Sequence, residues 1–204
     1  MNLFQRVIAV ATKPKEEWPV IAAETTTVGE IYSKVVVILV AIGPVCTALN
    51  SVIFGHSVPF TDITIRPSMT SVVAGMIISY VLQLIGVFVM AFIVEKLAPT
   101  FQSEGNLVQA FKLITYSYAP FWLAGALNLI PFLGILTFIV GLYGIYLAYV
   151  GLPFVMKTPP DKAVPYLIVV IVISIVVWFV IGLITAGIVG VGAWTAATAT
   201  HMGG

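Results

Sequence analysis

Five long apolar runs, separated by short polar segments, set the pattern of the chain. Each run is long enough to cross the hydrocarbon core of a bilayer as a helix, which takes about 20 residues. The runs cover residues 35–54, 72–94, 107–130, 132–156 and 164–191. The pattern therefore predicts an all-α integral membrane protein built as a bundle of five transmembrane helices.

A shorter amphipathic pattern precedes the first run. Between residues 2 and 12, Leu3, Val7 and Ala11 fall on one side of a helix, while Gln5 and Arg6 fall on another. A helix of this length cannot span a bilayer, and its two faces suit a position on the membrane surface. We therefore predict an amphipathic interfacial segment at the N-terminus.

The start of the first long helix has a local signal. Thr27 is followed three residues later by Glu30 and then by an apolar run, which is typical of a capping box. We divide the chain into an interfacial segment (1–33), a membrane domain (34–191) and a flexible tail (192–204).

Small residues recur at helical spacing in three of the apolar runs. Such residues let the backbones of neighbouring helices approach closely. The predicted helix-packing positions are Gly75, Ser79, Gly86, Gly141, Gly144, Ala148, Gly182, Ala186 and Gly190. They predict contacts within the bundle or between copies of the chain, so we expect a homo-oligomer or a complex with other membrane proteins.

The third apolar run differs from the others because polar and aromatic residues interrupt it between Lys112 and Trp122. In hydrocarbon these groups need partners from neighbouring helices or water. One interpretation is a proline-kinked helix whose tyrosines pack against partners and whose lysine extends to the headgroups. The other is a binding site or polar path, for which the candidate residues are Gln83, Lys112, Tyr116, Tyr118, Pro120 and Asn128.

Composition supports the membrane assignment and excludes several kinds of partner. The chain is 60% apolar and 8% charged, with a mean hydropathy of +1.12, whereas about a quarter of the residues in soluble proteins are charged. No basic cluster of the kind that binds nucleic acid is present. The single cysteine, Cys46, excludes an intrachain disulfide.

Neither a metal nor another cofactor is predicted. Glu16, Glu17, Glu24 and Glu30 lie close together in sequence, but they lack the spacing of a calcium loop and have no histidine among them. The chain also lacks a zinc-protease motif, a nucleophile elbow and a phosphate-binding loop. We therefore expect a protein that is not an enzyme.

Basic residues predict the orientation. Every Lys and Arg except Arg66 falls before the first run, between the second and third or near the start of the third, or between the fourth and fifth. The positive-inside rule then places the N-terminus in the cytoplasm and, with five spans, the C-terminus outside.

A short motif in the third run resembles that of a known family. Tyr116 and Ser117, followed three residues later by Pro120, resemble the Gly-Tyr-Ser-x-x-Pro signature of Yip (Ypt/Rab-interacting protein) domain proteins, with Thr115 in place of the glycine. The resemblance extends from about residue 4 to about residue 190, and it implies a five-span fold with a cytoplasmic N-terminus.

Other segments resemble the bacterial members of this family. Pro14, Trp18, Ile21 and Glu24 are similar to their pre-membrane pattern, and residues 143–153 to the fourth span of the family. The Asp-Leu-Tyr-Gly-Pro motif and the long cytoplasmic N-terminal region of eukaryotic members are absent. The resemblance thus implies a prokaryotic member in the cytoplasmic membrane and argues against binding of a Rab-type GTPase.

Two functions remain open from the sequence. The first is a non-catalytic membrane scaffold, or a membrane-organising or trafficking-type factor, that acts through helix–helix contacts. The alternative is a transporter or channel for an ion, a small solute or a lipid, with a polar path at spans two and three.

Overall fold

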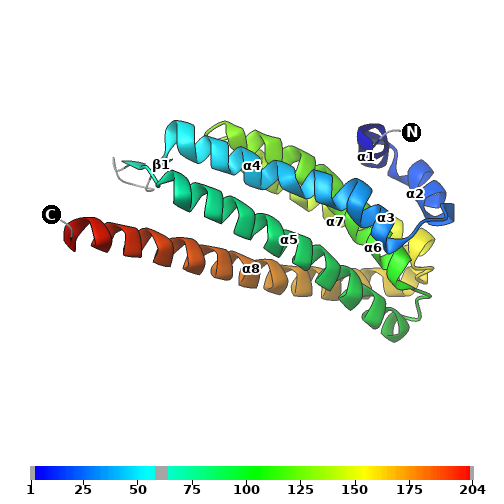
Figure 1. Ribbon diagram of the computed structural model, residues 1–204. Coiled ribbons are helices and arrows are strands. Elements are labelled where there is room, and N and C mark those ends of the chain that lie inside the picture. Colours follow the sequence, from blue (N-terminus) through cyan, green and yellow to red (C-terminus); the bar gives the residue numbers. More distant parts are fainter. Residues whose placement is uncertain (1–2, 58–63, 203–204) are drawn as a thin grey trace.

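The structure is a computed structural model that describes residues 3–57 and 64–202, with side chains placed for residues 3–55 and 66–187. Long helices run beside one another along a common axis, and short N-terminal helices cover one end of the bundle (Figure 1). The elements are α1 (Leu3–Thr12), α2 (Pro14–Ala23), α3 (Val28–Ile31), the π-helical η1 (Tyr32–Val36), α4 (Val37–Phe54), β1 (His56–Ser57), β2 (Thr64–Ile65), α5 (Met69–Leu97), the 3-10 helix η2 (Ala98–Phe101), α6 (Leu107–Ala124), the 3-10 helix η3 (Gly125–Leu129), α7 (Gly134–Val155) and α8 (Pro160–Met202).

The N-terminal elements begin and end where their local sequence predicts. α1 ends just before Pro14, which opens α2. The backbone N–H of Glu30 donates to the Thr27 hydroxyl at 3.2 Å, and the Thr27 N–H donates to the Glu30 carboxylate at 3.1 Å. The predicted capping box is therefore confirmed, and helix continues from Val28 through η1 to Phe54.

Among the described residues, four helical stretches are long and apolar enough, by length and composition, to cross a membrane. They are Val28–Phe54, Met69–Phe101, Gly134–Val155 and Pro160–Gly187. α6 is not among them, so the predicted count of five exceeds the number that length and hydropathy identify. Eleven of the 18 residues of α6 are buried, which means that protein rather than lipid surrounds much of this helix. Its crossing of the membrane stays a prediction.

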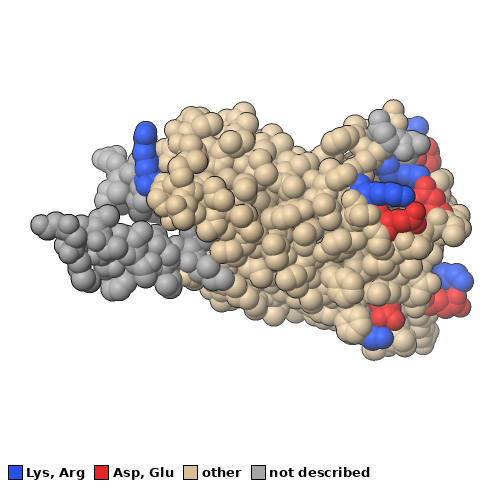
Figure 2. Space-filling model, in the orientation of Figure 1, with Lys and Arg blue, Asp and Glu red and all other residues tan. Residues whose placement is uncertain are grey.

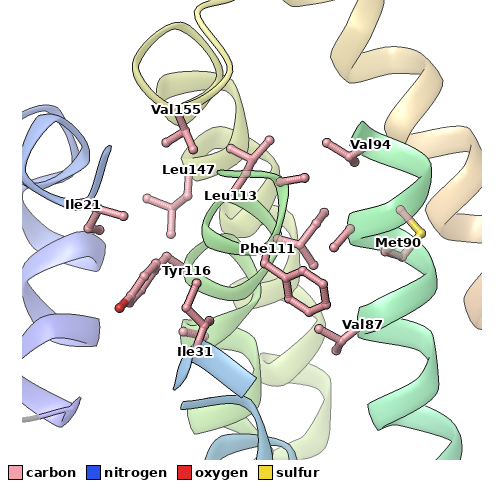
Figure 3. Packing of buried hydrophobic residues seen from close by; sticks show 14 of the residues in the cluster. Ile21, Ile31, Val87, Met90, Val94, Phe111, Leu113, Tyr116, Leu147 and Val155 are labelled. Carbon is pink, nitrogen blue, oxygen red and sulfur yellow. The ribbon is translucent and has the colours of Figure 1, made fainter. Parts of the chain in front are cut away.

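α6 contributes side chains to the core on several sides (Figure 3). Phe111 lies toward α5, where its ring makes an edge contact with Phe88 at a centroid distance of 5.3 Å. Leu113 lies toward Leu147 of α7, and Tyr116 lies toward α2 and α3. α6 therefore holds the N-terminal helices and the long helices in one hydrophobic core.

α6 ends before residue 130, where the third apolar run is predicted to end. α6 ends at Ala124 and the chain tightens into η3. A Cβ atom built on Gly125 would lie 2.9 Å from the Cα of Gly43, so the backbones of η3 and α4 are in close approach here. Phe132 then turns the chain with a φ of 69° before α7 begins.

The last helix is longer than predicted. α8 begins at Pro160 and its backbone stays helical to Met202, through most of the segment expected to be a flexible tail. Residues 203 and 204 lie outside the described residues. The flexibility of the tail stays a prediction.

Several of the predicted small residues lie where helices of the chain meet. A Cβ built on Gly86 would lie 2.7 Å from Cδ1 of Ile181 in α8, and one built on Gly144 would lie 2.7 Å from the carbonyl oxygen of Ser117 in α6. Gly141 lies against the ring of Phe121. By contrast, a Cβ on Gly182 would meet nothing within 4 Å, so this face of α8 is open.

The remaining predicted packing positions fall into three groups. Gly75, Ser79 and Ala148 are half-buried, and the Ser79 hydroxyl donates to the carbonyl of Met76 at 3.0 Å. Ala186 is exposed, as Gly182 is. Gly190 lies beyond the residues whose side chains the structure describes.

Charged side chains gather at the end of the bundle that carries α1 and α2 (Figure 2). Arg66 follows β2 and is exposed on the connection between α4 and α5, which lies at the other end of the bundle (Figure 1). The helices between the two ends present exposed apolar side chains, such as Ile77, Phe138 and Phe179. This distribution is what an apolar belt between two aqueous sides requires.

Candidate functional site

Lys112 is a buried charge at the junction between α6 and the N-terminal helices. The whole residue is only 1% exposed. The ammonium donates to the carbonyl oxygen of Glu24 at 2.6 Å and to that of Ala22 at 3.3 Å. These carbonyls lie at the C-terminal end of α2, where helix carbonyls lack intrahelical partners and carry partial negative charge. Lys112 therefore caps α2.

Gln109 supports the same contact from one turn earlier in α6. Its side-chain amide donates to the carbonyl oxygen of Ala22 at 3.3 Å. Residues three apart on a helix lie on the same face, which is why Gln109 and Lys112 meet the end of α2 together. Sequence reasoning missed Gln109, although its spacing from Lys112 was the available signal.

Arg6 extends this polar network to α1. Its guanidinium donates to the Glu17 carboxylate at 3.0 Å and also to the carboxylate of Glu24. The Arg6 side chain is only 14% exposed. Glu24 thus accepts from Arg6 through its side chain and from Lys112 through its carbonyl, and it joins α1, α2 and α6.

A small cavity of about 120 Å³ lies beside this network. It is lined by Glu24 and Thr26 from the segment between α2 and α3, by residues 30, 31, 34 and 35, and by Lys112 and Tyr116. Tyr116 is 8% exposed, and its ring lies on the side of α6 that faces α2 and α3 (Figure 3). Two of the predicted candidates, Lys112 and Tyr116, come together here.

A larger cavity of about 780 Å³ opens at the same end of the bundle. Its walls are the second half of α2, residues 103–106 ahead of α6, Gln109, and the end of α7 from Phe154 to Lys157. The Lys157 ammonium lies 2.6 Å from the carboxylate of Glu104. The pKa of Glu104 is lowered by this hydrogen bond and then by the charge of Lys157, so this carboxylate is ionised at neutral pH.

The family model that describes the Yip1 domain matches residues 8–182. The chain belongs to the Yip1 domain family. Comparisons with curated proteins and with solved structures gave no match. The matched residues of this Yip1 domain run from α1 into α8, so they include the α1–α2–α6 network and both cavities.

Other predicted polar residues of this Yip1 domain point in different directions. The Tyr118 hydroxyl donates to Ser174 of α8 at 3.1 Å, away from the side on which Tyr116 lies. Asn128 is in η3, where its side-chain oxygen accepts from Thr137 of α7 at 3.4 Å. Gln83 is half-buried in α5. Pro120 is buried within α6. The polar path through all six residues stays a prediction.

Acidic side chains in the Yip1 domain pair with basic ones. Glu30 accepts from Lys34 at 3.0 Å, and Glu17 accepts from Arg6. In the part of the chain that the structure describes, no group of three or more His, Cys, Asp or Glu side chains is placed to hold a metal ion. The contacts of Arg6 and Lys112 hold the N-terminal helices against the bundle.

Proposed function

We propose that this Yip1-family protein is a non-catalytic membrane scaffold or trafficking-type organising factor that acts through helix–helix contacts. Its partners are copies of itself or other membrane proteins. One observation carries the proposal: in the most apolar stretch of α8, only 6% of the residues are buried inside the chain. A helix left so open by its own bundle is available to a second helix.

The small residues of α8 support a protein partner in addition to lipid. Gly182 and Ala186 are exposed, with open space around Gly182. Lipid chains are as apolar as leucine, so contact with lipid does not favour small residues, whereas close helix contact does. Together with Gly190, these residues form the proposed face for self-association.

The proposal includes an orientation and a source. The N-terminus lies in the cytoplasm and the C-terminus outside, with α6 as the fifth crossing, and the protein is a bacterial-type member in a prokaryotic cytoplasmic membrane. The gathering of basic residues at the end that carries α1 and α2 supports this orientation.

The test is the oligomeric mass of the gently solubilised protein by native mass spectrometry. Replacing Gly182, Ala186 and Gly190 together with leucine should reduce multiples of the 21.9 kDa chain to single chains. Val180→Leu is the control, because Val180 is 46% exposed and lies on a different side of α8 from these three residues. An unchanged oligomer in the triple variant would discard this interface.

Transport is the second candidate. Three buried polar groups of α6, the hydroxyls of Thr115 and Ser117 and the indole N–H of Trp122, have no hydrogen-bond partner among the described residues. Polar groups inside a membrane protein mark pathways in many transporters. Solute flux into vesicles that falls with Gln83→Leu and Tyr116→Phe would favour this function over the scaffold.

A further inference from the structure

The 780 Å³ cavity has the size of a ligand site and no role in the proposed scaffold. Pockets that bind small molecules enclose about 300–1,000 Å³ and combine apolar walls with a few placed polar groups. Here Pro19, Ala22 and Val155 supply apolar wall, and Glu104, Gln109 and Lys157 supply polar groups. The cavity lies where α6 begins and α7 ends, among the charged residues of that end.

We propose that this cavity binds the headgroup of a zwitterionic phospholipid, one with an ammonium and a phosphate such as phosphatidylethanolamine. The lipid comes from the leaflet on the side of α1 and α2. Its phosphate pairs with Lys157, and its ammonium pairs with Glu104.

Charge complementarity favours a zwitterion. Lys157 and Glu104 are 2.6 Å apart and contribute one positive and one negative charge to the rim. A headgroup with both charges offers a partner to each. A headgroup with phosphate alone would pair with Lys157 and leave the Glu104 carboxylate beside another anion, which is unfavourable.

The backbone at Lys157 supports a role beyond the fold. Lys157 follows α7 with a φ of 48°, in the left-handed region. Glycine is the common residue at this position after a helix, because a side chain there adds strain. Such strain at a non-glycine residue is a reason to look for function, and here it holds the ammonium against Glu104.

The exposed apolar side chains at and near the cavity fit a lipid better than a soluble zwitterion. Phe154 lines it and is 41% exposed, within the last turn of an apolar membrane helix. Val20 on α2 is also exposed. Acyl chains of a lipid whose headgroup occupies the cavity would lie against such surfaces, whereas a soluble molecule would leave them in water.

The experiment is native mass spectrometry of the delipidated full chain, titrated in detergent with phosphatidylethanolamine or with phosphatidylglycerol of the same acyl chains. We expect one phosphatidylethanolamine per chain, bound more tightly than phosphatidylglycerol. Lys157→Gly should weaken this binding about tenfold, since it removes a charge-assisted contact. Because glycine suits the left-handed backbone, the same variant should keep or raise the melting temperature.

Controls separate this site from lipid bound anywhere on the surface. Lys162→Ala removes a neighbouring lysine that pairs with Asp161 at 3.4 Å outside the cavity, and it should leave binding unchanged. Three outcomes would overturn the proposal: equal binding by Lys157→Gly, equal affinity for phosphatidylglycerol, or equal affinity for water-soluble glycerophosphoethanolamine.

Discussion

At the scale of single residues, two buried polar side chains of the charged end donate to backbone carbonyls of other helices. Lys112 donates to the carbonyls of Ala22 and Glu24, and the hydroxyl of Tyr166 donates to the carbonyl of Val94. A carbonyl that already accepts within its helix has a second lone pair. Such bonds join segments 72 to 90 residues apart in the chain, so each affects the position of a whole helix.

Lys112→Met tests the first of these contacts. Methionine keeps a long side chain of similar bulk but removes the donor to the Glu24 carbonyl and leaves only Gln109 on that of Ala22, which should destabilise the docked N-terminal helices by about 1–3 kcal/mol. Faster proteolysis or hydrogen exchange between α2 and α3 would report the loss. Lys96→Met, at an exposed lysine, is the control, and equal protection in both variants would contradict the capping role.

Tyr166→Phe tests the second contact. Tyr166 is fully buried, and its hydroxyl donates to Val94 of α5. Removing the hydroxyl should lower the free energy of unfolding by about 0.5–1.5 kcal/mol, measured by denaturant unfolding in mild detergent. Tyr149 is 44% exposed, so Tyr149→Phe should have little effect, and an equal loss there would argue against the interhelical bond.

At the scale of elements, α6 and α7 pack closely against each other where α7 has small residues. Gly144 and Gly141 of α7 lie against Ser117 and Phe121 of α6. Hydroxyl bonds from tyrosines make comparable connections elsewhere: Tyr32 donates to Leu84 at 2.8 Å, which links η1 to α5. The bundle is therefore held by close backbone contact on one side of α6 and by side-chain bonds to carbonyls elsewhere.

Gly144→Ala should destabilise the bundle. The added methyl group would lie 2.7 Å from a backbone carbonyl oxygen, and the backbone must shift to accept it. We expect a loss of about 1–3 kcal/mol. Gly29→Ala is the matched control, because a Cβ on this helical glycine would also meet nothing within 4 Å. Thermal unfolding of both variants in the same detergent decides the matter, and equal melting temperatures would refute the close contact.

At the scale of the whole molecule, the proposed orientation assigns each exposed position to one side of the membrane, which labelling can test. In a Cys46→Ser background, cysteines at Thr25 and Asp161 should react with a membrane-impermeant maleimide only after the cells are opened, whereas one at Thr70 should react in intact cells. Position 161 tests whether α6 crosses the membrane. With α6 as a crossing, four crossings precede Asp161 and place it in the cytoplasm; without α6, three crossings would place it outside. Labelling of Asp161→Cys in intact cells would exclude α6 as a crossing.

The sequence predicts those features that depend on neighbouring residues. The capping box at Thr27 and the end of the first amphipathic pattern at Thr12 are short-range, and they are found where expected. The polarity of Lys112 and Tyr116 marks α6 as unusual, but their partners include backbone carbonyls and a cavity formed by distant segments. Every residue has a carbonyl, so no sequence pattern identifies which one Lys112 binds.

The burial of α6 also bears on how the chain is made. By length and composition, four helices in the described part of the chain are apolar enough to cross a membrane, whereas α6 carries Lys112 in its second turn, and a lysine makes a lone helix less prone to insert. Its partner α7 follows after a short connection. In the proposed five-crossing topology, newly synthesised α6 would therefore stay at the membrane surface until α7 is also synthesised. The two helices would then insert together as a hairpin.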